Sequence, residues 1–228
     1  MAAGLFYQGE APVFTATLAF VAGFADTVGF IGLFGLFTAH VTGNFALIGA
    51  SIAGSATGVM AKLLALPIFI GVVAITALYA RHCERTSRAA APAVLSAPLV
   101  LLAGFLGVGV LFAPFTEGNA SFAILTGMIG VAVMAVQNAA ARTVFSELSP
   151  TTVMTGNVTQ IVIDVVTLGE GALARLSKRI PPVLAFAAGA IGGGVAFAAA
   201  GFLSLSVPIF GPGALLAASM RLRTIKAV

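Results

Sequence analysis

The stretch His40-Val41-Thr42-Gly43-Asn44 has a counterpart about half a chain length later, Val153-Met154-Thr155-Gly156-Asn157, which shares its Thr-Gly-Asn. Both copies of Thr-Gly-Asn lie within apolar sequence. Glycine permits a turn or a close backbone approach, and Thr and Asn offer hydroxyl and amide groups at the start of a helix. Two such elements in matching places indicate a duplicated chain with a polar site at its centre.

The composition indicates a membrane protein. Hydrophobic residues make up 60% of the 228 residues and charged residues only 8%, whereas a soluble domain carries roughly 25% charged residues. The uncharged stretch 95–115 is long enough to cross the hydrocarbon core of a bilayer. We therefore expect most of the surface to face lipid.

Charge and cysteine content exclude several other classes of protein. The formal net charge is +4, and the basic residues lie in short loops and near the C-terminus. This pattern is typical of membrane orientation and not of nucleic-acid binding. Cys83 is the only cysteine, which excludes a disulfide within one chain. The chain has no glycine-rich phosphate loop, metal-ligand spacing or Ser-His-Asp arrangement, so we expect neither an enzyme nor a cofactor.

The hydropathy pattern predicts an all-α polytopic membrane protein with the same order of segments in each half. Asp26 lies 18 residues before Asn44, and Asn138 lies 19 residues before Asn157. We therefore predict one transmembrane domain, 1–228, built of two repeats at about 11–115 and 120–220. The predicted spanning helices are 13–37, 63–80, 95–115, 121–144, 183–202 and 204–220, and the Thr-Gly-Asn segments are 40–55 and 151–168.

The Thr-Gly-Asn segments are predicted to enter the membrane and return. They are short and polar, and each unsatisfied polar group costs several kcal/mol in hydrocarbon. If both return, ten of the eleven basic residues share one side and only Lys62 lies opposite, as the positive-inside tendency favours. Six spans and two half helices then form an inverted repeat whose half helices meet near the midplane. The C-terminus is expected in the cytoplasm.

Asp26 is the strongest single candidate for a functional residue. It lies in the middle of an apolar helix, and intramembrane acids tend to mark ion or proton pathways. Asn157, Gln160 and Asp164 are spaced to share one helix face. The predicted substrate or ion site comprises Asp26, Thr42, Gly43, Asn44, Asn138, Thr155, Gly156, Asn157, Gln160 and Asp164, with His40 and Gln137 as gating or secondary residues.

A structural interpretation of the same residues stays open. Asn44 and Asn157 could merely cap their own helices and lock the two halves together. Asp26 could merely tie helices to one another by hydrogen bonds. The run Gly189-Ala190-Ile191-Gly192-Gly193-Gly194 has the spacing of closely packed membrane helices. We expect it to pack within the chain.

Two stretches resemble the YoaK family, a group of bacterial inner-membrane proteins known mainly as a domain of unknown function. The first runs from Gly23-Phe24-Ala25-Asp26-Thr27-Val28-Gly29-Phe30 to Phe37-Thr38-Ala39-His40-Val41-Thr42-Gly43-Asn44. The second runs from Gln137-Asn138-Ala139 to Thr155-Gly156-Asn157. The resemblance covers essentially the whole chain. It implies a bacterial plasma-membrane location and no particular substrate.

Together these features predict a transporter of a small polar solute or ion, coupled to protons through Asp26. Two alternatives remain, namely a passive channel of the same architecture and a non-transporting membrane scaffold or sensor. The expected partners are the solute and the lipid bilayer, with no nucleic acid. A homo-oligomer is compatible with the sequence.

Overall fold

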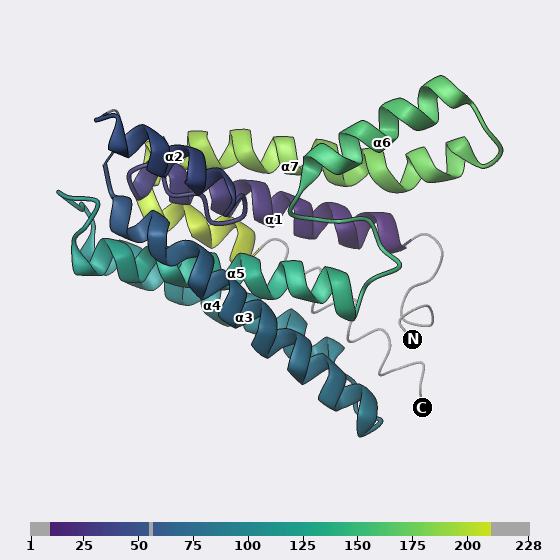
Figure 1. Ribbon diagram of the computed structural model, residues 1–228, viewed down its shortest axis with the longest axis horizontal. Helices are drawn as coiled ribbons and strands as arrows, with labels where there is room; N and C mark the ends of the chain where they lie inside the picture. Colours follow the sequence, from purple (N-terminus) through teal and green to yellow (C-terminus); the bar gives the residue numbers. More distant parts are fainter. Residues whose placement is uncertain (1–9, 55–56, 211–228) are drawn as a thin grey trace.

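The computed structural model describes residues 10–54 and 57–210, and this part of the chain is helical with no strand (Figure 1). The prediction of an all-α fold is confirmed. The helices are α1 (Glu10–Gly32), α2 (Gly43–Ile52), α3 (Val59–Arg85), α4 (Ala91–Phe112), α5 (Ser121–Thr143), α6 (Met154–Thr167), α7 (Ala172–Ala200) and the 3-10 helix η1 (Gly201–Leu205).

Five helical segments are long and apolar enough to cross a membrane. They are α1, α3, α4, α5 and the stretch Ala172–Phe210, which joins α7 to η1. These lengths and compositions are those of a multi-pass membrane protein. Most of the sixth predicted span, 204–220, lies outside the described residues, as does the C-terminus. The count of six spans therefore stays a prediction.

Each Thr-Gly-Asn helix is preceded by ten non-helical residues. We call 33–42, between α1 and α2, the first connection, and 144–153, between α5 and α6, the second connection. The sequence predicted helix as far as residue 37, but α1 ends at Gly32. Phe34 and Gly35 have φ values of 55° and 80°, a left-handed conformation that cannot continue an α-helix.

The long helices pack in pairs. α1 packs along α7 and α3 along α5, while α4 also contacts α5. The short helix α2 lies on α3, and α6 lies on α7. The long-helix contacts thus join the two halves of the chain, whereas the contacts of α2 and α6 stay within one half.

Glycines bring the backbones of α1 and α7 into contact. A Cβ atom added at Gly23 would lie 2.2 Å from the Phe186 carbonyl oxygen, and one at Gly189 would lie 2.2 Å from the Phe20 carbonyl oxygen. One at Gly193 would approach the carbonyl oxygen of Phe24 to 2.7 Å. The prediction that the glycine-rich run packs within the chain is confirmed.

The buried interior lies on α1 and α5, and the outer helices carry the exposed apolar side chains. Phe24 of α1 and Met134 of α5 are almost fully buried. By contrast, α3 and α4 expose large aliphatic side chains, among them Ile75, Leu78 and Leu111. Contiguous apolar surface of this kind is typical of helices that face lipid.

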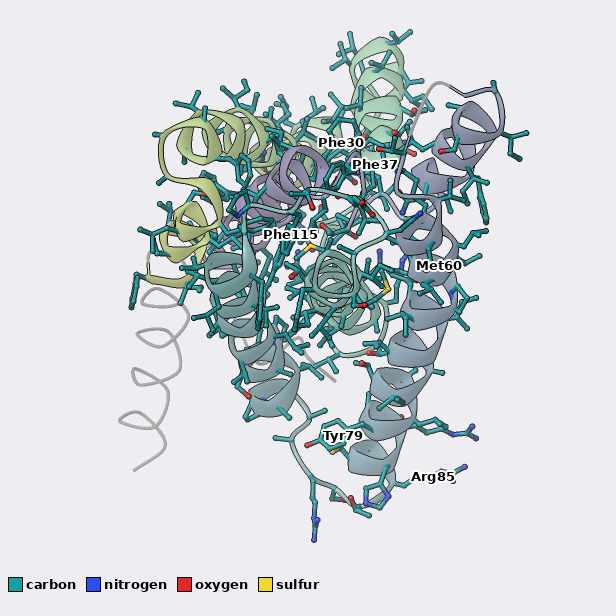
Figure 2. The ribbon with its side chains drawn as sticks, turned by 90° about the vertical axis from the view of Figure 1, so that its left-hand side faces the viewer. Phe30, Phe37, Met60, Tyr79, Arg85 and Phe115 are labelled. Carbon is teal, nitrogen blue, oxygen red and sulfur yellow. The ribbon has the colours of Figure 1, made fainter. Side chains whose placement is uncertain are left out.

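All described basic residues except Lys62 lie towards one end of the molecule, which we call the basic end. α3 and α5 end there and α7 begins there (Figure 1). Figure 2, viewed from the opposite end, shows Phe30, Phe37 and Phe115 near the middle of the bundle and Arg85 far from them at the end of α3. The described basic residues at these helix ends are Arg81, Arg85, Arg88, Arg142, Arg175, Lys178 and Arg179.

Lys62, near the start of α3, lies at the opposite end and is buried. Its side chain is 2% exposed, and Nζ donates to the carbonyl oxygens of Phe34 at 2.8 Å, of Thr57, and of Gly58 at 3.5 Å. Lys62 therefore holds the first connection against the start of α3. It does not add a solvated positive charge to that end.

We expect the turn between α4 and α5 and the second connection to face opposite sides of the membrane. The test uses a Cys83→Ala background carrying either Glu117→Cys or Glu147→Cys, both at exposed positions. On intact cells, an impermeant maleimide should label Glu117→Cys and reach Glu147→Cys only after the membrane is opened. Arg85→Cys serves as a control and should behave like Glu147→Cys. Labelling of positions 117 and 147 from the same side would contradict this topology.

Candidate functional site

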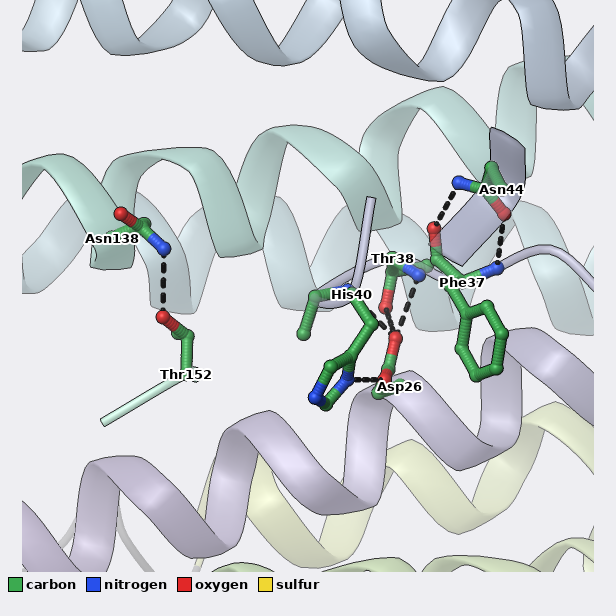
Figure 3. A network of polar contacts seen from close by, with 8 residues as sticks. Asp26, Phe37, Thr38, His40, Asn44, Asn138 and Thr152 are labelled. Atoms are coloured by element: carbon green, nitrogen blue, oxygen red, sulfur yellow. Dashed lines mark hydrogen bonds and ion pairs between the residues drawn. The ribbon is translucent and has the colours of Figure 1, made fainter. Parts of the chain in front are cut away.

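Asp26 of α1 holds the first connection. The residue is 5% exposed, and Oδ1 accepts the backbone N–H groups of Thr38 and Ala39, both at 2.7 Å (Figure 3). The Thr38 hydroxyl lies 3.3 Å from the same oxygen, and His40 Nδ1 lies 2.6 Å from Oδ2. A carboxylate can only accept hydrogen bonds, and here both of its oxygens are engaged. Asp26 therefore fixes residues 38–40 against α1.

Asn44 holds the same connection from its other side. It is 1% exposed; Oδ1 accepts the Phe37 N–H at 3.0 Å, and Nδ2 donates to the Phe37 carbonyl oxygen at 2.9 Å (Figure 3). No side chain caps the start of α2. The interpretation that Asn44 caps its own helix is therefore wrong, and it pairs instead with a residue seven positions earlier. Asp26 and Asn44 together hold the segment 37–40. We use the term first anchor for these two residues and that segment.

The second half of the chain repeats this plan with neutral side chains. Gln137 Nε2 of α5 donates to Thr151 Oγ1 at 3.1 Å and to the Leu18 carbonyl oxygen of α1 at 2.9 Å. Asn138 Nδ2 donates to Thr152 Oγ1 at 2.8 Å (Figure 3). Both threonines lie in the second connection and are buried. The two amides of α5 thus take the place that Asp26 has on α1.

Asn157 completes the second arrangement. Its Nδ2 donates to the Pro150 carbonyl oxygen at 2.9 Å, again seven residues earlier, and the residue is 4% exposed. Here too no side chain caps the helix start. We call Gln137, Asn138, Asn157 and the segment 150–152 the second anchor. Each Thr-Gly-Asn motif therefore uses its Asn to close the connection that precedes it.

His40 is the accessible titrating group of the first anchor. Its side chain is 35% exposed, and its ring lies edge-on to Phe186 at a centroid distance of 5.5 Å. Within the described part of the chain, Nε2 has no hydrogen-bond partner. The hydrogen bond to Asp26 raises the pKa of His40 above its usual 6.5; the negative charge of Asp26 adds to this effect, and burial opposes it.

Asp164 of α6 belongs to an ion pair with α7. Its Oδ1 lies 2.8 Å from Arg175 Nε, and its Oδ2 lies 2.5 Å from Arg179 Nη1. The hydrogen bond from Arg175 lowers the pKa of Asp164. Sequence reasoning did not connect Asp164 with these arginines, although their spacing of four residues places them on one helix face.

This ion pair lies towards the basic end, at the start of α7. The helix has 29 residues, which at 1.5 Å per residue is about 43 Å and exceeds a hydrocarbon core of about 30 Å. We therefore expect the first turns of α7, which carry Arg175 and Arg179, to extend past the core. As predicted, Asn157 and Asp164 share the face of α6 that is buried, and Gln160 on that face is half-buried.

The remaining predicted residues make fewer contacts. Thr42, Thr155 and Gly156 are exposed, and Gly43 packs near the Phe37 ring. Across residues 10–54 and 57–210, no hydrogen bond or ion pair joins the first anchor to the second. In the same ranges, no group of three His, Cys, Asp or Glu side chains could hold a metal ion. A meeting of the two motifs at the midplane remains a prediction.

Comparison with known proteins places the chain in a family. A family model described as "Protein of unknown function (DUF1275)" matches residues 14–219, which include both anchors. The chain belongs to the DUF1275 family. The resemblance to the YoaK family is consistent with this membership. No curated protein and no solved structure matches the chain.

In this DUF1275 protein, Asn44→Ala should destabilise the fold more than Asn157→Ala. The first change leaves the part-buried N–H and carbonyl of Phe37 both unpaired, at a cost of at most about 2 to 6 kcal/mol. The second leaves only the Pro150 carbonyl, which costs about 1 to 3 kcal/mol. Thermal unfolding of the purified protein in detergent measures the difference. Equal losses, or a larger loss for Asn157→Ala, would show that the Phe37 clamp does not stabilise the first connection.

The Asp164 ion pair should stabilise the DUF1275 protein only above acidic pH. Because its pKa is lowered on folding, its contribution is present above the ordinary value near 3.8 and disappears as the pH falls through the lower folded value. Wild type should therefore melt at a higher temperature than Asp164→Asn at pH 7, and the difference should shrink progressively as the pH falls below 3.8. A difference independent of pH would indicate that the charge of Asp164 does not contribute.

Proposed function

We propose that this protein transports a small polar solute or ion across the bacterial plasma membrane in exchange for, or together with, protons. The observation that carries the proposal is the pair of Asp26 and His40, joined at 2.6 Å and with the imidazole ring partly exposed. The sequence pointed to Asp26 as the proton carrier. In the structure the oxygens of Asp26 hold the first connection, so we assign proton uptake to His40.

The geometry supports reversible protonation without loss of the anchor. In the neutral form, His40 Nδ1–H donates to Asp26 and the Nε2 lone pair is free to accept a proton. In the protonated form, the negative charge of Asp26 balances the imidazolium. In both forms Asp26 keeps its bonds to the N–H groups of Thr38 and Ala39.

Protonation would change the net charge of the first anchor by one unit. A cation or polar solute beside the anchor would bind differently in the two states, and by thermodynamic reciprocity its binding would change the proton affinity of His40. The second anchor contains neutral Gln137, Asn138 and Asn157 and has no comparable step. The proton site would therefore lie on one half of the chain only.

An inverted repeat is part of the proposal. α1 and α5 have 23 residues each, and the connections after them have ten each. If each helix of the first half is matched with its counterpart in the second half, the α1–α7 pair corresponds to the α5–α3 pair. In the same way, the α2–α3 contact corresponds to the α6–α7 contact. α1 and α5 end at opposite ends of the bundle (Figure 1). These relations support two oppositely oriented units, about 11–115 and 120–220, whose half helices enter from opposite sides.

One observation favours a second candidate function, a non-transporting scaffold or sensor. Asp26, Asn44, Gln137, Asn138 and Asn157 all bind connections of the same chain. Such contacts can serve structure alone, so flux has to be measured.

Proteoliposomes containing a pH-sensitive dye provide the test. Imposed gradients of a panel of small amines, amides, organic acids and inorganic ions should reveal at least one solute that moves protons. His40→Gln should slow this proton flux about tenfold or more, while His82→Gln, which alters the other histidine of the chain, should leave it unchanged. The pH midpoint of the wild type should lie above 6.5, and Asp26→Asn should lower it because the partner that raises the pKa is removed.

A panel in which no solute moves protons through folded wild type would favour the scaffold. Flux that survives His40→Gln in full would leave transport standing and overturn the assignment of the proton to His40.

A further inference from the structure

The second anchor contains a buried acceptor without a partner. Gln137 is 3% exposed, and among residues 10–54 and 57–210 its Oε1 finds no hydrogen-bond donor. A buried carbonyl-type oxygen left unpaired costs about 1 to 3 kcal/mol, so such atoms call for an explanation.

The orientation of the Gln137 amide is fixed by its donors. Nε2 lies 2.9 Å from the Leu18 carbonyl oxygen and 3.1 Å from Thr151 Oγ1. Rotating the amide by half a turn would place its oxygen against the Leu18 carbonyl oxygen, which can only accept. Oε1 therefore remains the atom that needs a donor.

Gln137 also lines a small cavity between α1, α4 and α5. Its volume is about 20 Å³, somewhat more than the 10–15 Å³ that one water molecule needs. Pro98 lines the same cavity and has no N–H to donate to the Val94 carbonyl one helical turn earlier. The other lining residues are apolar: Leu18, Val21, Val94, Leu95, Leu99, Leu102, Ala140 and Phe145.

The first anchor shows what kind of partner Oε1 requires. There, one carboxylate oxygen of Asp26 binds the connection and the other has His40 Nδ1 at 2.6 Å. Thr151 follows Gln137 by fourteen residues, as His40 follows Asp26. Thr151 Oγ1 accepts from Nε2, and no residue in the described part of the chain donates to Oε1.

We propose that this cavity binds one small neutral molecule that donates a hydrogen bond to Gln137 Oε1, and that in the resting protein this molecule is water. A volume of this size accommodates about one water-sized molecule. The apolar walls disfavour a bare cation, whose lost hydration they could not replace. The second hydrogen of the water can be donated to the Val94 carbonyl oxygen, because Pro98 has no N–H to donate to it. The inference does not depend on proton transport by His40.

The test observes water beside Gln137 directly. The chain has three glutamines, Gln8, Gln137 and Gln160, so the changes Gln8→Asn and Gln160→Asn leave Gln137 as the only one. With glutamine labelled by ¹³C and ¹⁵N, solid-state NMR of the full chain in lipid bilayers should show magnetisation transfer from water protons to the Gln137 side chain. The absence of that transfer in the folded parent protein would overturn the proposal.

Matched variants locate the water. Ala140→Val fills the cavity without touching the bonds of Gln137 and should abolish the transfer, whereas Ala141→Val, on the same helix but outside the cavity, should preserve it. If Ala140→Val does not fold, Ala140→Cys adds a single sulfur and should reduce the transfer at least severalfold. Undiminished transfer in a folded position-140 variant would place the water elsewhere and overturn the proposal.

Discussion

Non-helical backbone inside an apolar bundle must find hydrogen-bond partners outside its own segment, and this requirement organises the molecule. In the first connection, Asp26 and Asn44 serve the N–H groups of Thr38, Ala39 and Phe37 and the carbonyl of Phe37. Each of these groups, if it were left unpaired in lipid, would destabilise the fold by several kcal/mol. The placement of α2 and α6, and of every candidate site residue near them, follows from how these connections are held.

The two anchors differ in chemistry although they share a plan. The first anchor contains an acid paired with a histidine, Asp26 with His40, whereas the second pairs amides of α5 with threonines of the second connection. A charged anchor responds to pH, whereas a neutral anchor responds only to hydrogen-bond donors and acceptors. The two anchors thus differ in charge, because Asp26 pairs with His40 in the first and Gln137 pairs with Thr151 in the second.

Much of the fold could be predicted from residue patterns. Apolar length predicted the long helices, and the Thr-Gly-Asn motifs marked the starts of α2 and α6. The glycine-rich run around Gly189 and Gly193 predicted close packing within the chain, and the structure shows that its partner is α1. The end of α1 was missed because the left-handed conformation at Phe34 falls on a residue that rarely adopts it.

The site was less predictable because its partners come from tertiary structure. Asp26, Asn44 and Asn157 stood out as polar groups in apolar sequence, but no local rule pairs an Asn with the residue seven positions earlier. The arginines that bind Asp164 come from the next helix and were counted only as orientation signals. Lys62 was likewise counted as a loop charge, yet it is buried against backbone carbonyls.

The glycine contacts between α1 and α7 limit how this molecule can change shape. Where two backbones touch, as at Gly23, Gly189 and Gly193, no side chain can swivel to let one helix slide past the other. Any movement of α1 relative to α7 would therefore have to break these backbone contacts or carry both helices together.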